Sequence, residues 1–179
     1  MTILTKFGIR VAVVFCFWRI CFGLSCGPDD LANFTVVMRY FNNDPELKGN
    51  LFGMKLTRGD DGSVASSLTQ VDVPEAVKKH LVSRLNPRIR IPHNHDLDRE
   101  FVGQLDDNAW DGWLKLRKVH PHAAGIIDLS LPGYNDQRTL ALIYAVREWN
   151  ITFAQAYLFI TVKTKRGWQI RKILRAWKS

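Results

Sequence analysis

Apolar residues near the start of the chain recur at the spacing of an amphipathic helix. Over residues 31–41 they stand three and four positions apart, and Asp29 and Asp30 precede them. Acidic side chains in the first turn stabilise a helix because they lie at the positive end of its dipole. The pattern therefore predicts a helix that begins at Pro28 and ends within 42–45, since the residue before a proline avoids the helical region.

The same reasoning predicts further elements up to residue 119. Val77, Leu81 and Leu85 share one face of a helix whose first residue is Pro74, a position that suits proline because no backbone N–H is needed there. The predicted elements are a short strand over 51–56, a turn over 58–63, a helix over 74–85, a loop over 87–100 and a helix over 109–119.

From Gly125 onward the pattern changes to the period-two alternation of half-buried strands. It predicts strands over 125–131, 139–149 and 154–162, with a turn over 132–136 after the first of them. A hairpin turn over 165–167 follows the third strand.

The last apolar segment, 168–177, fits two structures. Ile170, Ile173, Leu174 and Trp177 stand at helical spacing, so the period favours a helix. The preceding turn, and the need to pair the exposed edge of the third strand, favour a strand. We expect the strand.

Helices that precede strands predict the α+β class. We expect amphipathic helices packed on one face of a C-terminal antiparallel sheet of about four strands. A chain of 179 residues accommodates one such domain, over 26–179, in which 105–179 forms a helix and a β-meander.

Residues 1–25 have the layout of a secretory signal peptide, with a basic start, an apolar run over 11–18 and small residues at the end. Arg19 divides the apolar residues into two pieces, and a central arginine costs roughly 2.5–3.5 kcal/mol on membrane insertion. We therefore expect export to the periplasm, the envelope or the medium, with a membrane-anchored protein as the alternative. The basic residues are Lys6 and Arg10, and the small ones are Gly23 and Ser25.

Cys26 directly follows the predicted cleavage point, where it could accept a lipid. Leu24 lies one position out of register with the usual lipidation motif. Membrane contact through the N-terminus or a lipidated Cys26 is thus an alternative to a free protein. Removal of 1–25 would take Cys16 and Cys21 away and leave a single cysteine.

The net charge of +8 lies at the two ends of the chain. Residues 163–179 hold seven basic side chains and no acidic one, interleaved with Trp168 and Trp177. Such a segment could bind an anionic surface, and its candidate residues are Arg171, Lys172 and Arg175. Lys and Arg also protect a sheet edge from aggregation, and an exported protein rarely meets nucleic acid, so we expect no nucleic-acid partner.

Residues typical of turns and of a core form a pattern over about 105–179, in the C-terminal half of the chain. It consists of Trp110 and Trp113, then Gly125 with Leu129-Ser130-Leu131-Pro132-Gly133-Tyr134-Asn135, then Thr139 with Ala141-Leu142-Ile143-Tyr144, then Gly167-Trp168 and Trp177. The pattern resembles a family of small exported bacterial proteins without assigned activity. That resemblance implies a curved sheet wrapped on helices, similar to cystatin-like or nuclear-transport-factor-like domains, and implies no activity. The cysteines that many members carry between the second and third strands are replaced here by Trp149-Asn150-Ile151-Thr152.

Two His-x-His pairs are the candidate metal ligands, namely His93 with His95 and His120 with His122. Imidazoles together with nearby carboxylates could hold zinc or copper. Both pairs lie beside prolines in predicted loops, where exposed histidines are common without any metal.

No other motif indicates catalysis. Ser130 lacks the glycines of a nucleophile elbow, and no glycine-rich phosphate loop is present, so we expect no nucleotide cofactor. The sequence favours a non-catalytic binding or envelope-associated module. The alternatives are a metal-binding protein or metal-dependent hydrolase that uses the four histidines, and a binder of anionic surfaces through the basic C-terminal strand.

Overall fold

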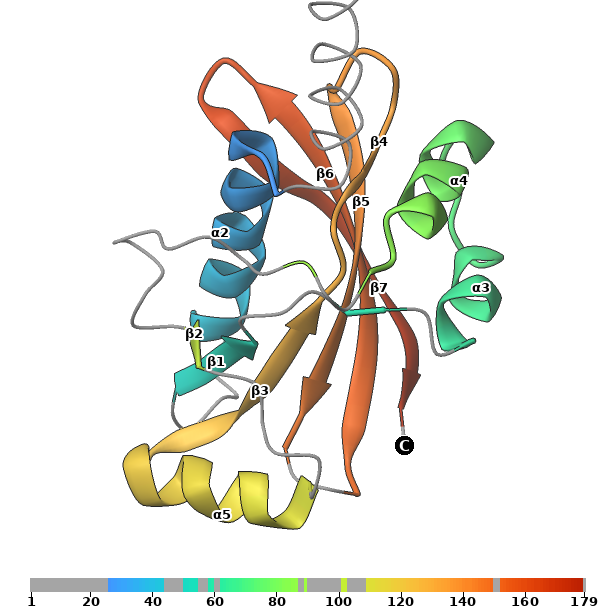
Figure 1. Ribbon diagram of the computed structural model, residues 1–179. Coiled ribbons are helices and arrows are strands. Elements are labelled where there is room, and N and C mark those ends of the chain that lie inside the picture. Colours follow the sequence, from blue (N-terminus) through green and yellow to red (C-terminus); the bar gives the residue numbers. More distant parts are fainter. Residues whose placement is uncertain are drawn as a thin grey trace, which may run out of the picture.

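The computed structural model describes residues 26–43, 50–54, 58–59, 62–86, 89, 101–102, 109–149 and 152–178. In chain order (Figure 1) the elements are α2 (Pro28–Asn42), β1 (Asn50–Met54), α3 (Ser63–Leu68), α4 (Glu75–Ser83), β2 (Phe101–Val102), α5 (Ala109–Val119), β3 (Ala123–Leu129), β4 (Gly133–Tyr134), β5 (Leu140–Glu148), β6 (Ala154–Thr164) and β7 (Gly167–Lys178).

One sheet holds all the described strands, in the order β2-β1-β3-β5-β6-β7, and β4 pairs with β5. Strands β3, β5, β6 and β7 are antiparallel neighbours, as the sequence predicted. Strand β1 runs parallel to both β2 and β3, which makes the sheet mixed. The structure thus confirms the α+β class, with a C-terminal antiparallel sheet extended by two parallel strands.

Helices cover both faces of the sheet, and the expectation that they would share one face is wrong. Phe34, Val37 and Phe41 of α2 pack with Ile143 and Phe159 on one side. Helices α3 and α4 pack on the other side (Figure 1), against the remaining face of the same strands. Residues on both faces of β5 and β6 are therefore buried, as in three-layer folds.

The final segment is strand β7 and not a helix. Phe159 pairs with Ile173 and Leu158 with Leu174, so these two neighbours in sequence point to opposite faces of the sheet. Two register shifts in the β6–β7 ladder each insert an extra residue into β7. Side chains three positions apart in β7 therefore share a face, which explains the helical spacing in the sequence.

Several smaller predictions are corrected. Residues 58–63 were expected to form a turn, but α3 begins at Ser63, and the predicted turn at 132–136 contains strand β4. Pro74 caps α4 and is not its first residue. Most of the predicted loop over 87–100 lies outside the described residues.

Candidate functional site

A buried ion pair joins the first turn of α2 to the end of α4. The Arg84 guanidinium donates to both Asp30 oxygens, at 2.9 Å from Nη1 to Oδ1 and at 2.8 Å from Nη2 to Oδ2. Arg84 is 6% exposed and Asp30 1%. Two parallel hydrogen bonds fix the relative orientation of the two groups as well as their distance.

Further hydrogen bonds satisfy the rest of this buried network. Tyr134 of β4 donates its hydroxyl to Asp30 Oδ1 at 2.8 Å, and Gly27 N donates to Asp30 Oδ2 at 2.7 Å. Arg84 Nη1 also donates to the Pro132 carbonyl at 2.7 Å. Burial, together with the charge of Asp30, raises the pKa of Tyr134. Its phenol therefore remains a proton donor at physiological pH.

The network continues from α2 into the sheet. Asn33 Nδ2 donates to the Tyr134 hydroxyl at 3.3 Å, and Thr161 of β6 donates to Asn33 Oδ1 at 2.6 Å. All of these side chains are buried. They hydrogen-bond one another and fasten α2 to α4, β4 and β6, which is a structural arrangement. Nothing in the sequence pattern pairs Asp30 with Arg84, 54 residues apart, so the ion pair could not be predicted from it.

Cys26 lies beside this network, half-buried against the core under α2. Burial and the charge of Asp30 raise the pKa of its thiol to about 12, although Arg84 acts in the opposite direction. The thiol is therefore protonated at neutral pH and is a poor nucleophile. Its lipidation stays a prediction.

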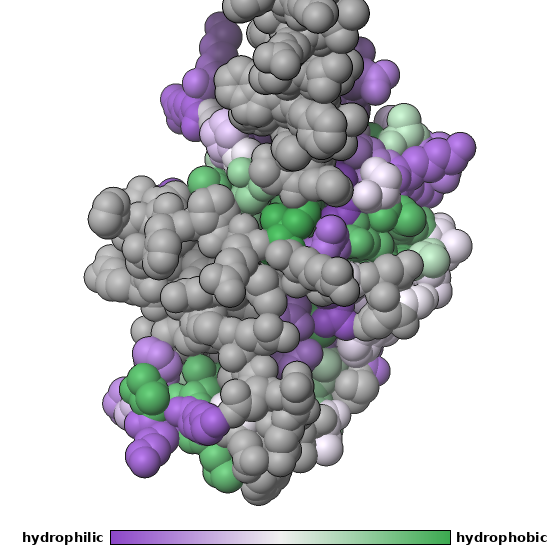
Figure 2. Space-filling model, in the orientation of Figure 1, coloured by the Kyte–Doolittle hydropathy of each residue, from purple (hydrophilic) through white to green (hydrophobic). Residues whose placement is uncertain are grey.

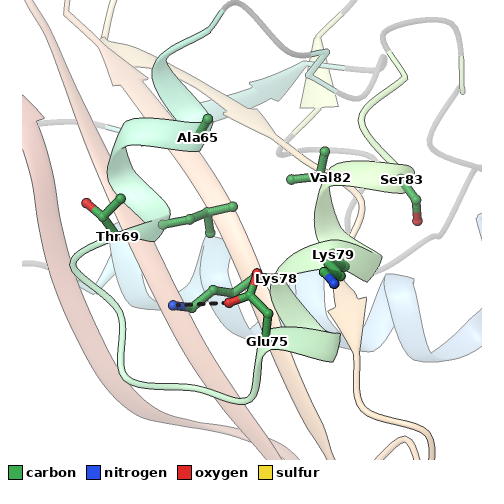
Figure 3. A pocket seen from close by; sticks show the side chains of 8 residues that line it. Ala65, Thr69, Glu75, Lys78, Lys79, Val82 and Ser83 are labelled. Atoms are coloured by element: carbon green, nitrogen blue, oxygen red, sulfur yellow. Dashed lines mark ion pairs between the residues drawn. The ribbon is translucent and has the colours of Figure 1, made fainter.

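A surface groove lies between α3 and α4, with a volume of about 430 Å³. Both helices turn their most apolar side chains to the sheet, with Val64 and Leu68 buried in α3 and Val77 and Leu81 in α4. The adjacent faces of the two helices line the groove. Its lining residues (Figure 3) are Ala65, Leu68, Thr69, Glu75, Lys78, Lys79, Val82 and Ser83.

The groove combines an apolar floor with a cationic margin. The apolar floor includes Leu68, which is buried, and Val82, which is 44% exposed although it is aliphatic. Lys78 Nζ lies 3.8 Å from Glu75 Oε2 (Figure 3), a distance at which the ion pair is weak. Lys79 is exposed, and the lining of the groove therefore holds two ammonium groups and one carboxylate. No pattern in the sequence indicates this groove.

A second polar cluster lies on the sheet face that α3 and α4 cover. Arg58 Nη1 is 3.1 Å from Asp128 Oδ2 on β3. Burial and the nearby charge of Asp128 raise the pKa of Glu148 on β5, while Arg58 lowers it. The Tyr144 hydroxyl accepts from Trp177 Nε1 at 2.8 Å. These bonds tie the segment at Arg58 and the end of β7 to the sheet.

The structure describes two of the four predicted metal ligands, His120 and His122. His120 and His122 stand beside the turn that follows α5, the first half-buried and the second exposed. His93 and His95 lie outside the described residues. Within the part of the chain that the structure describes, no group of three or more His, Cys, Asp or Glu side chains could hold a metal. The histidine site stays a prediction.

The three predicted cations of the C-terminal strand do not share a face. All are exposed on β7, which forms one edge of the sheet. Arg175 pairs with Tyr157 and thus points to the α2 face, whereas Lys172 pairs with Ile160 and points to the opposite face. Arg171 is the extra residue at the register shift between Ile170 and Lys172. Their binding of an anionic surface also stays a prediction.

No helix of the described residues is both long enough and apolar enough to cross a bilayer. Comparison of the chain with protein-family models, with curated proteins and with solved structures gives no match.

Proposed function

We propose that this chain is an exported, non-catalytic binding module. Its site is the α3–α4 groove, and its ligand is an amphipathic small molecule with an apolar body and an anionic group. The apolar floor of the groove, edged by Lys78 and Lys79, is the observation that supports this proposal. The predicted signal segment supports export.

The size and lining of the groove suit a small molecule. Ligand sites commonly measure about 300–1,000 Å³ and are lined mainly by apolar side chains with a few polar groups. The groove, at about 430 Å³, lies within that range. Solvent-exposed Val82 and Ala65 gain burial when an alkyl chain covers them, at about 25 cal/mol for each Å² removed from water.

The surroundings of the groove favour binding over catalysis. A Ser or Thr hydroxyl becomes a nucleophile only beside a general base. Thr69 and Ser83 line the groove, and the one carboxylate of the lining, Glu75, faces Lys78. The charged groups of the buried ion pair, Asp30 and Arg84, lie in the core and do not line the groove.

The test is a fluorescence titration of the full chain with 11-(dansylamino)undecanoic acid. We expect saturable binding with one site for each chain. Ala65→Trp fills the groove from its exposed side and should raise Kd at least about tenfold, the effect of roughly 1.4 kcal/mol. Ala76→Trp is the matched control, because Ala76 is exposed on α4 and does not line the groove. Equal effects of the two variants, or no saturable binding, contradict the proposal.

The anionic group is tested separately with the methyl ester of the same probe. We expect the acid to bind more tightly than the ester. The double variant Lys78→Gln/Lys79→Gln should remove that preference and leave ester binding unchanged. An unchanged preference in the double variant would show that the lysines take no part.

A further inference from the structure

Two connections of the sheet carry exposed cations at the end of the molecule where α2 begins, and two of these cations, Lys163 and Arg138, lie near Asp29. We propose that this end of the molecule, called here the basic end and formed by Arg138, Lys163, Lys165 and Arg166, docks on the headgroups of an anionic lipid bilayer. The inference does not depend on the groove and its ligand.

The turn between β6 and β7 is fastened to α2. Asp29 Oδ1 accepts from Lys163 Nζ and from Trp168 Nε1, both at 2.9 Å. Partial burial disfavours the Asp29 carboxylate, but these two hydrogen bonds and the charge of Lys163 lower its pKa on balance. Asp29 thus stays ionised and holds the β6–β7 turn against the start of the helix.

The connection between β4 and β5 reaches the same end of the molecule. Lys163 N donates to the Thr139 carbonyl at 2.8 Å. Asn135 Oδ1 accepts from Thr139 N at 2.8 Å and from Leu140 N at 2.9 Å, which makes the connection rigid. The Arg138 guanidinium lies 4.8 Å from the centroid of the Tyr134 ring. Its positive charge contributes to the lowered pKa of Asp29. Figure 1 shows both connections at the end of the sheet where α2 begins.

Positive charge predominates at the basic end. Asp30 is neutralised by Arg84 in the core, and Asp29 by Lys163. Asp136 is the acidic side chain that remains exposed in the 134–140 connection, and the 163–168 turn contains no acid. Lys165 and Arg166 form the exposed tip of their turn, and hydrophilic residues are seen at this end of the molecule (Figure 2).

The position of the N-terminal segment favours a bilayer over other anionic partners. Residue 26 directly precedes α2, so the predicted apolar run over 11–18 and Cys26 both connect to the basic end. A lipid on Cys26 brings this end to the headgroups, and so does insertion of the run in the membrane-anchored alternative, where it is not cleaved. Basic side chains at a membrane surface each strengthen binding to anionic lipid by about fivefold, and the effect decays within a Debye length.

The experiment measures partition of the full chain onto two kinds of vesicle in 0.1 M salt. One contains phosphatidylcholine alone, and the other contains phosphatidylcholine with 30% phosphatidylglycerol. The ratio of the two partition coefficients isolates the electrostatic contribution from apolar insertion. We expect the triple variant Arg138→Gln/Lys165→Gln/Arg166→Gln to lower this ratio at least about tenfold, and 0.5 M salt to lower it similarly in the unchanged protein.

The matched control removes the same charge elsewhere, with Arg171→Gln/Lys172→Gln/Arg175→Gln on β7. We expect its ratio to stay within about twofold of the unchanged protein, because these cations are divided between the two faces of the sheet edge. Circular dichroism confirms that all three proteins are folded. Equal losses in both variants, or a loss confined to the β7 variant, overturn the proposal. So does tighter binding to a 20-nucleotide single strand than to the anionic vesicles at equal salt.

Discussion

At the scale of single residues, the most consequential contact is the pair of Arg84 with Asp30. Both charges are almost fully buried, so each depends on the other, and Asp30 also depends on the hydrogen bonds from Tyr134 and Gly27. Removal of one partner from a buried pair leaves a charge with neither water nor counter-ion, which is far more destabilising than the loss of a surface pair. The network therefore determines whether α2 and α4 stay in place.

We predict that Arg84→Met lowers the free energy of unfolding by about 3–5 kcal/mol, because Asp30 is then buried without its counter-ion. Urea denaturation followed by circular dichroism measures the change. Lys78→Met breaks the 3.8 Å surface pair with Glu75 and should change the same free energy by less than about 1 kcal/mol. Similar values for the two variants would show that the buried pair has no special role.

At the scale of elements, β7 shows where sequence patterns mislead. Its apolar residues at positions 170, 173, 174 and 177 have helical spacing, yet they belong to a strand with two register shifts. Each shift moves the following side chains to the other face, so a spacing of three replaces a spacing of two. The preceding turn and the unpaired edge of β6 indicated the strand correctly. The shifts themselves depend on pairing with β6, which the local sequence does not show.

Strand β4 lies unusually close to helix α4. A Cβ added at Gly133 would lie 2.6 Å from Leu81 Cα, which is backbone of the helix and cannot rotate away. We predict that Gly133→Ala lowers the free energy of unfolding by about 3 kcal/mol or more, at the upper end of the effect of overpacking. Thermal and urea unfolding of the variant measure this change.

Gly62→Ala is the control for that substitution. Gly62 has a φ of +83°, and a Cβ added there meets no atom within 4 Å, so alanine introduces backbone strain but no clash. We expect a loss of about 1–2 kcal/mol. If Gly133→Ala proves no more harmful than Gly62→Ala, the close approach of β4 to α4 is not a constraint on stability.

At the scale of the whole molecule, the three layers bring distant segments of the chain together. The groove joins α3 to α4, and the basic end joins residues around positions 29, 138 and 165. The proposed function places the protein outside the cytoplasm, as the pattern of residues 1–25 predicts. Export is therefore the premise to test first in cells.

We predict that intact-mass measurement on fractionated cells finds a chain that starts at or just after Cys26, with or without an added lipid mass. Val13→Lys places a charge within the apolar run and should leave the precursor unprocessed, because a charge there opposes insertion. Val13→Leu keeps the run apolar and should be processed normally. Full-length protein in the cytosol would contradict export and restore nucleic acid as a possible partner.

The sequence by itself determined the class of the fold and most of its elements. Local spacing, turn residues and prolines predict helices α2 and α5, strands β5 and β6 and the hairpin before β7, because these signals act between residues close in the chain. Only the tertiary structure decided which face each helix covers, the register of β7, the pairing of Asp30 with Arg84, the groove and the gathering of cations around Asp29. These features join segments up to about 140 residues apart, as the bond from Trp168 to Asp29 shows. No local period encodes such contacts, since they depend on the path that the whole chain takes through the sheet.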